Sequence, residues 1–289
     1  MQQILLAMLL PIISMSLYLY LYTPSIKEVL TGTASNFATS GGYGPNQVAT
    51  VIGLGMFILF MRLFFIKDRL INIIDLALLG LISYRGIITF SRGGIVTAII
   101  CILVFSVVYF FYARQKTRIS FGFKFILVLA LALGVWILSS INTGGLIDKR
   151  YSNQDAAGRI KEDVTTGRVD LFDAELQAFF QNPLTGIGVG KIKEYRYEQT
   201  GRLSATHNEV TRMLSEHGLF GLFALTVLFF TPLLFRIKNR TNLFLYSFFV
   251  FWFLTINHSS MRIAAPSFIY GLALITITYA QGKNTLHRK

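Results

Sequence analysis

The most regular feature of the chain is a series of long apolar runs separated by short polar segments. A helix that crosses a bilayer needs about 20 mostly apolar residues, and eight runs approach that length, the seventh being short. They are Ile4–Tyr22, Val48–Ile66, Leu70–Phe90, Gly94–Tyr112, Phe123–Ile141, Leu219–Phe235, Leu243–Ile256 and Ser267–Ala280. This pattern predicts an all-α, polytopic integral membrane protein in which residues 1–289 form a single membrane domain.

Charge on the polar segments predicts how the chain is oriented. Short basic segments remain in the cytoplasm, and four are found here: Lys67–Arg69, Arg114–Arg118, Arg236–Arg240 and Lys283–Lys289. Alternation of eight spans then puts both termini in the cytoplasm. It puts four other segments on the outer face: residues 23–45, 91–94, 142–216 and 257–266.

The long polar segment (residues 142–216) has nearly balanced charge and contains a predicted helix. Its apolar residues recur at helical spacing on one face, and Asn182-Pro183 ends the pattern. These apolar residues are Val169, Phe172, Leu176, Phe179 and Phe180. We expect this amphipathic helix to lie on the membrane or on the helical bundle.

Composition narrows the function classes. Hydrophobic residues make up 53% of the chain and charged residues 14%, against about 25% charged in ordinary globular domains. The net charge of +13 comes mainly from short loops, which indicates a membrane surface and membrane lipids as partners, with no nucleic acid. The single cysteine excludes a disulfide framework, and no group of Asp, Glu, His and Cys has metal-ligand spacing.

One polar stretch stands directly before an apolar run. Thr206 and Glu209 form a T-x-x-E capping box, which predicts a helix with Thr206 as its N-cap and with His207 and Asn208 in its first turn. The positive end of a helix favours anions and favours histidine in its neutral form. A neutral imidazole beside a bound anion is a suitable general base. The alternative interpretation is a polar cap on a membrane helix.

Arginines mark a second candidate site. Arg92 is at the outer boundary of a span, and Arg85 lies seven residues earlier, on the same face if the helix continues. An arginine inside a membrane is a functional hypothesis by default, and guanidinium groups bind phosphate in bidentate fashion, although Arg92 could also snorkel to the interface. Gly93 and Gly94 permit close approach of a ligand or backbone. Arg168 is either part of this site or a solvated charge.

Four segments taken together resemble the O-antigen ligase and O-antigen polymerase superfamily of bacterial membrane glycosyltransferases. They occur in the family's order: Gly42–Ala49; Thr89–Gly94; Gly167-Arg168 with Asn182–Gly188; and Thr206–Glu209 with Glu216–Gly221. The chain differs from the family in one respect. Members usually carry several more spans before the Gly-Pro-Asn-Gln turn, whereas one precedes it here, as expected of a shortened member, a fragment or a misplaced start.

The resemblance implies an all-helical transferase that uses no nucleotide sugar, metal or other cofactor. Its donor is a glycan on undecaprenyl diphosphate at the outer face of the bacterial inner membrane. Its acceptor is a sugar hydroxyl, on lipid A–core in a ligase or on another lipid-linked glycan in a polymerase. By this likeness His207 is the base, and Arg92 and Arg168 hold the diphosphate. Further candidates are Arg85 for the diphosphate and, as supporting residues, Asn46, Asn208, Glu209 and Arg212.

Two other functions remain open from the sequence. One is a subunit of a polysaccharide transporter or flippase, although the repeated halves common in transporters are not visible here. The other is an inactive assembly partner that keeps the fold. Ligase and polymerase differ in the acceptor, and no motif in the chain reports which acceptor is used.

Overall fold

The computed structural model describes residues 1–30, 32–35, 37–112, 115–163, 167–201, 206–238, 242–259 and 263–277, and within them the fold is helical with no strand. Six helices are long and apolar enough to cross a membrane. They are α1 (Gln2–Tyr22), α3 (Pro45–Phe65), α4 (Arg69–Ile88), α5 (Arg92–Tyr112), α6 (Gln115–Asn142) and α10 (Glu209–Lys238). The shorter helices are α2 (Ile26–Val29), the 3-10 turn η1 (Ala38–Ser40), α7 (Leu146–Tyr151), α8 (Arg168–Gln181), α9 (Ile192–Thr200), α11 (Leu245–His258) and α12 (Ala265–Ala273).

These helices confirm the predicted all-α, polytopic membrane fold. Each of the six long helices coincides with one predicted span. The count of eight is not confirmed, because α11 is shorter than a full span and α12 has nine residues. The predicted eighth span runs to Ala280, and its last residues lie outside the described part of the chain.

Aromatic side chains form the centre of the bundle around α3. Phe57 packs edge-to-face against Phe105 of α5 and Phe248 of α11, with ring centroids 6.2 and 6.1 Å apart. All three side chains are buried. Because lipid is as apolar as these rings, the hydrophobic effect does not drive the helices together inside a membrane. Close van der Waals packing holds them instead.

Glycine allows α3 and α5 to touch through their backbones. A Cβ on Gly94 would overlap the backbone carbonyl of Ala49, and a Cβ on Gly53 would overlap the carbonyl oxygen of Gly94. The sequence predicted close approach at Gly94, and the structure shows that the neighbour is the α3 backbone. This contact fixes the start of α5 against α3.

We expect Gly94→Ala to destabilise the protein by about 1–3 kcal/mol or more, because backbone cannot move aside as a side chain can. The measurement is the free energy of unfolding in detergent micelles. Gly134→Ala in α6 is the matched control, since a Cβ there meets nothing within 4 Å. Equal stability of the two variants would contradict the close contact.

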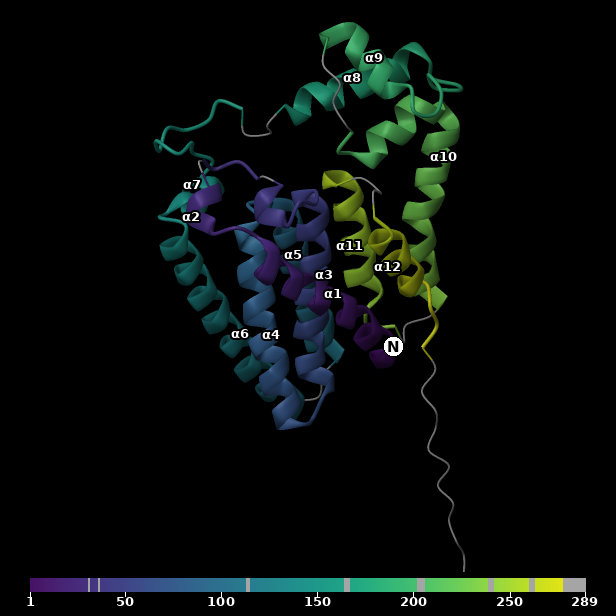
Figure 1. Cartoon of the computed structure of the whole chain (residues 1–289). Helices are drawn as coiled ribbons and strands as arrows, with labels where there is room; N and C mark the ends of the chain where they lie inside the picture. Colours follow the sequence, from purple (N-terminus) through teal and green to yellow (C-terminus); the bar gives the residue numbers. More distant parts are fainter. Residues whose placement is uncertain are drawn as a thin grey trace, which may run out of the picture.

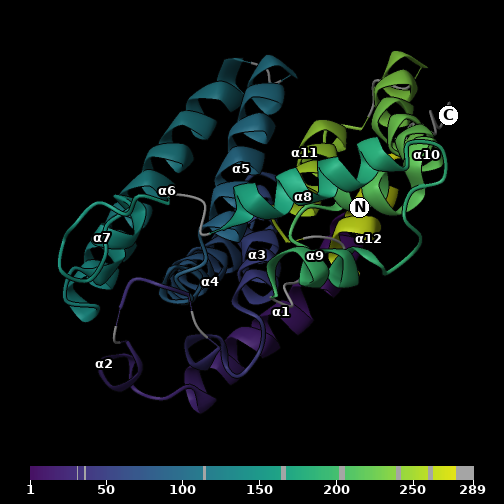
Figure 2. The same ribbon diagram turned by 90° about the horizontal axis from the view of Figure 1, so that it is seen from above.

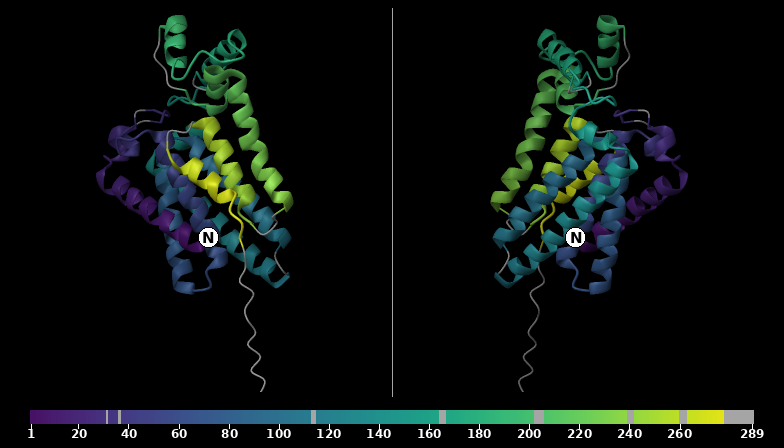
Figure 3. Two further views of the ribbon diagram at one scale, coloured as in Figure 1. Left: turned by 90° about the vertical axis from the view of Figure 1, so that its right-hand side faces the viewer. Right: turned by 90° about the vertical axis from the view of Figure 1, so that its left-hand side faces the viewer.

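The polar elements gather at one end of the bundle. Figure 1 shows α2, α7, α8 and α9 at its upper end, and the turn between α3 and α4 at the opposite end. The side views in Figure 3 show α8 and α9 standing above the bundle, joined to it by α10. This arrangement agrees with the predicted grouping of segments, while the side that faces the cytoplasm stays a prediction.

A sharp break divides α10 in two. Gly218 has φ 60° and ψ −137°, values outside the helical region that glycine adopts readily. The loop after α8 fills the break: the backbone N–H of Leu219 donates to the Pro183 carbonyl at 2.8 Å, and that of Ile187 donates to the Ser215 carbonyl at 2.9 Å. The break therefore lies directly before Leu219, where the predicted apolar run starts.

Helix α8 forms where predicted, but its predicted apolar face is not buried in the protein core. Ala174, Glu175 and Ala178 are buried against the neighbouring helices, whereas Phe172 and Phe180 are exposed. Figure 2 shows α8 crossing above α11. The polar Glu175 lies on the inward side, where it accepts hydrogen bonds from Thr206 and Thr211 and forms an ion pair with Arg196, as described below.

Candidate functional site

Three arginines from separate elements lie close together at the polar end. They are Arg92 at the start of α5, Arg150 in α7 and Arg168 at the start of α8. Arg92 Nη1 donates to the backbone carbonyl of Arg150 at 3.4 Å. Burial lowers the pKa of Arg150, and the charges of Arg92 and Arg168 lower it further. The pKa of Arg168 is lowered by burial and then by Arg92. The clustered charges create a positive potential, which disfavours the charged form of each arginine and favours a bound anion.

A strained turn places Arg92. Phe90 is buried and has φ 58°, a left-handed conformation that costs about 1–3 kcal/mol for a residue other than glycine. The turn is stabilised on both sides. The Ser91 hydroxyl donates to Asn46 Oδ1 at 2.7 Å, and Arg150 Nε donates to the Phe90 carbonyl at 3.1 Å. Asn46 therefore supports the segment that presents Arg92.

Arg85 lies apart from this turn. The condition under which Arg85 and Arg92 would share a helix face is not met, because α4 ends at Ile88 and the turn at Thr89–Ser91 intervenes. Arg85 is buried and donates to the Thr39 carbonyl at 3.3 Å and to the Thr23 hydroxyl. These contacts hold it against α1 and η1, and a role toward diphosphate stays a prediction.

His207 lies just before α10, and the predicted capping box does not form. Asn208 is the cap: its Oδ1 accepts the backbone N–H groups of Val210 at 2.8 Å and Thr211 at 3.3 Å. Thr206 has other partners, and α10 begins at Glu209. His207 therefore precedes the cap instead of lying in the first turn. It lines a cavity of about 190 Å³ together with Arg168, so the structure brings these two predicted residues together.

A buried polar network holds the residue before His207. Arg196 of α9 and Glu175 of α8 are each only 1% exposed, with 3.5 Å between Arg196 Nη1 and Glu175 Oε1. The Thr206 hydroxyl donates to Glu175 Oε1 at 2.8 Å and accepts from Arg196 Nη2 at 2.9 Å. Thr211 also donates to Glu175. Burial raises the pKa of Glu175, and these hydrogen bonds oppose that rise.

The remaining charges near the start of α10 form ion pairs with one another. Arg212 contacts Glu209 one turn earlier, and its Nη1 lies 3.8 Å from Glu216 Oε2. These ion pairs lie along the part of α10 before Gly218. Glu209 and Arg212 thus stabilise the helix that begins beside His207.

His258 joins the bundle to the site in a way that the sequence did not show. Its Nδ1 donates to the Leu254 carbonyl at 2.8 Å, and its Nε2 lies 3.3 Å from the Thr50 hydroxyl. Any Cβ on Gly93 would overlap the His258 ring. Gly93 therefore makes room for this imidazole beneath Arg92, a role that the motif alone could not reveal.

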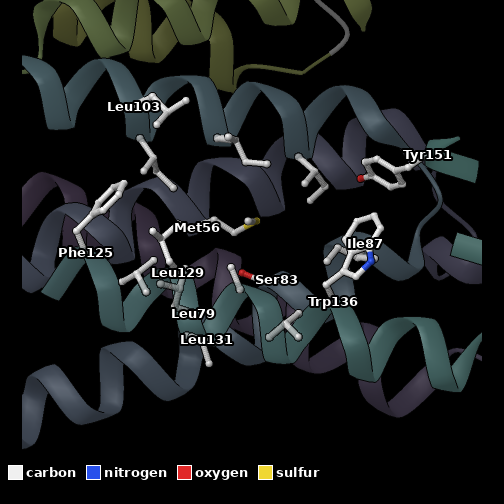
Figure 4. Close-up of a pocket in the computed structure, with 16 residues that line it drawn as sticks. Met56, Leu79, Ser83, Ile87, Leu103, Phe125, Leu129, Leu131, Trp136 and Tyr151 are labelled. Atoms are coloured by element: carbon white, nitrogen blue, oxygen red, sulfur yellow. The ribbon is translucent and has the colours of Figure 1, made fainter. Parts of the chain in front are cut away.

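An apolar groove opens below the arginines. It is a cavity of about 210 Å³ lined by α3, α4, α5 and α6, with Tyr151 at one end. Figure 4 shows Trp136 and Tyr151 together at that end, and their rings meet edge-to-face at 4.9 Å. Burial raises the pKa of Tyr151 to about 12, against the opposing charges of Arg92 and Arg150. Groove and arginines therefore meet at Tyr151.

The site thus suits an amphiphilic anion. It combines an apolar groove, three clustered cations and a cavity containing a histidine. The described residues contain no group of three or more His, Cys, Asp and Glu able to hold a metal ion.

One comparison with known proteins identifies a family. A family model described as O-antigen ligase matches residues 76–226, more than half of the chain, and the match includes all three arginines of the cluster and His207. No curated protein and no solved structure matches the chain.

Proposed function

We propose a specific reaction for this chain, which belongs to the O-antigen ligase family. Members of that family are glycosyltransferases of the O-antigen ligase type. Here the reaction moves a glycan from undecaprenyl diphosphate to a sugar hydroxyl. The observation that carries the proposal is the junction of an apolar groove, the Arg92–Arg150–Arg168 cluster and the cavity of His207.

Donor binding uses the groove and the arginine cluster. The part of the polyprenyl chain next to the diphosphate lies in the apolar groove, and the diphosphate lies against Arg92, Arg150 and Arg168. Guanidinium groups match phosphate oxygens in paired hydrogen bonds. Because charge builds up on the leaving diphosphate, fixed cations at that place lower the barrier. The site residues thereby do what a metal ion does in other transferases.

His207 supplies the base. An acceptor hydroxyl must lose its proton as it attacks, and an imidazole within reach accepts it. The new bond forms between the acceptor oxygen and the anomeric carbon, and the bond from that carbon to the diphosphate oxygen breaks. Attack from the opposite face inverts the anomeric configuration without a covalent enzyme intermediate. Retention of configuration in the product would contradict this mechanism.

The location follows from the basic loops. With these loops in the cytoplasm, the protein is a multi-pass protein of the bacterial inner membrane with both termini inside. The long polar segment and the site then face outward, where lipid-linked glycans are presented. Lipid A–core or a second lipid-linked glycan provides the acceptor.

The test is a gel of surface glycans and lipid-linked glycans from a strain that lacks the gene, with and without the wild-type copy. If the missing protein is a transferase, lipid-linked glycan accumulates on the outer face of the membrane, where externally added lectin can bind it. Full-length chains on the lipid indicate a ligase, and single repeats indicate a polymerase. Lipid-linked glycan that stays shielded from the lectin would instead identify a transporter or flippase subunit. Normal glycans in the strain would contradict the proposal.

We expect Arg150→Leu to raise the KM for the lipid diphosphate donor about 10- to 100-fold, since a hydrogen bond to a charged group contributes about 1.5–3 kcal/mol. The assay uses purified protein and donor extracted from the deletion strain. Arg159→Leu is the matched control, because Arg159 is 81% exposed and its ion pair among the described residues is with the nearby Asp155. An unchanged donor KM in folded Arg150→Leu protein would remove Arg150 from the donor site.

A further inference from the structure

We infer that the cavity beside His207 is the subsite for the acceptor sugar, with the Phe172 ring stacked on the sugar and with Asn208 and Asn257 bonded to its hydroxyl groups. This inference rests on the proposed function and goes beyond it, because it assigns the acceptor to particular side chains. The lining includes residues of α8 and α11 and the segment before α10.

The size of the cavity suits one sugar ring. Its volume of about 190 Å³ is below the roughly 300 Å³ at which sites for drug-sized ligands begin. It shares no lining residue with the apolar groove. The lipid of the donor and the sugar of the acceptor would therefore approach the arginine cluster through different openings.

Phe172 provides an apolar platform inside this cavity. Its side chain is 40% exposed, and it lies one turn before the buried Glu175. Phe172 lies three residues before Glu175 and therefore on the same side of α8, and both side chains line the cavity together with Val169. An aromatic face beside polar side chains matches a sugar, which has apolar C–H faces and a polar edge.

The two asparagines offer complementary hydrogen-bonding groups. Asn208 Oδ1 is occupied by the backbone N–H groups of Val210 and Thr211, so its Nδ2 points elsewhere and has no partner among the described residues. Asn257 Nδ2 donates to the Phe253 carbonyl at 2.8 Å, so its Oδ1 is the atom left over. One free donor and one free acceptor satisfy a hydroxyl group, which both accepts and donates.

The cavity also connects this subsite to the reaction. His207 and Arg168 line it together with Phe172. A sugar held there presents a hydroxyl to the imidazole, while Arg168 belongs to the cluster proposed for the diphosphate. Acceptor, base and leaving group are thus brought to one place.

The test measures KM separately for the two substrates. The acceptor is the glycolipid fraction of the deletion strain, quantified by sugar content, and the donor is the undecaprenyl-linked glycan of that strain. We expect Phe172→Ala to raise the acceptor KM about 3- to 10-fold, as aromatic contacts of this kind provide, with the donor KM unchanged. Phe172→Trp should restore the acceptor KM, and Asn257→Leu should raise it.

Phe180→Ala is the matched control on the same helix, since Phe180 is 71% exposed and lies outside the cavity lining. It should leave both KM values unchanged. No change in Phe172→Ala, an effect on the donor alone, or equal effects on both substrates would overturn the subsite. Inactivity of the wild-type protein in this assay would instead refute the proposed function, so the two failures are distinguishable.

Discussion

Replacing His207 with glutamine is expected to lower the rate of glycan transfer by about 10²- to 10⁴-fold, the usual contribution of a general base. Glutamine keeps a polar side chain of similar length but cannot take a proton. Since Asn208, not His207, caps α10, the helix should form normally. The measurement is initial rate with purified protein, alongside the unfolding midpoint in the same detergent.

The pH dependence gives a second readout for His207. The base must be neutral to act, so the wild-type rate should rise with pH as the imidazole loses its proton and then level off. That rise should vanish in His207→Gln. His217→Gln is the control, because His217 lies at the end of the first part of α10, beside the break at Gly218. A His207→Gln protein with wild-type rate would exclude this residue as the base.

The spans could be predicted because the bilayer imposes a length. The run Val48–Ile66 corresponds to α3 at Pro45–Phe65, since only a continuous apolar helix satisfies its backbone inside lipid. The predicted apolar run that starts at Leu219 begins directly after the break in α10 at Gly218. The seventh run, Leu243–Ile256, is short, and the corresponding α11 is likewise shorter than a full span.

The site could be predicted only in part. Arg92, Arg168 and His207 belong to recognisable segments, and the structure places Arg92 and Arg168 in one cluster and His207 beside Arg168. Arg150 could not be found, because it lies in a six-residue helix with no pattern of its own. The predicted cap does not form because the Thr206 hydroxyl makes its hydrogen bonds elsewhere. It donates to the buried Glu175 and accepts from the buried Arg196.

Arg196→Met is expected to lower the free energy of unfolding by about 3–5 kcal/mol, the typical effect of removing one partner of a buried ion pair. Methionine fills similar space, so the loss is electrostatic. Glu175 would be left in an apolar setting with only hydroxyl partners. Because Glu175 contacts both Thr206 and Thr211, the substitution should also destabilise the start of α10. Transfer activity should then fall in proportion to the folded fraction.

A double variant separates the charge from the packing. Glu175→Leu with Arg196→Met removes both charges, and a matched apolar pair in place of a buried ion pair is often neutral or stabilising. The double variant should therefore be more stable than Arg196→Met alone, and comparison with the two single variants, Glu175→Leu and Arg196→Met, gives the coupling free energy between the two sites. Arg159→Met is the exposed control, with an expected change of about 0–1 kcal/mol. Additive losses in the double variant would show that the pair does not act as one unit. If the double variant recovers stability but not activity, the ion pair also positions Thr206, and through it His207, for the transfer reaction.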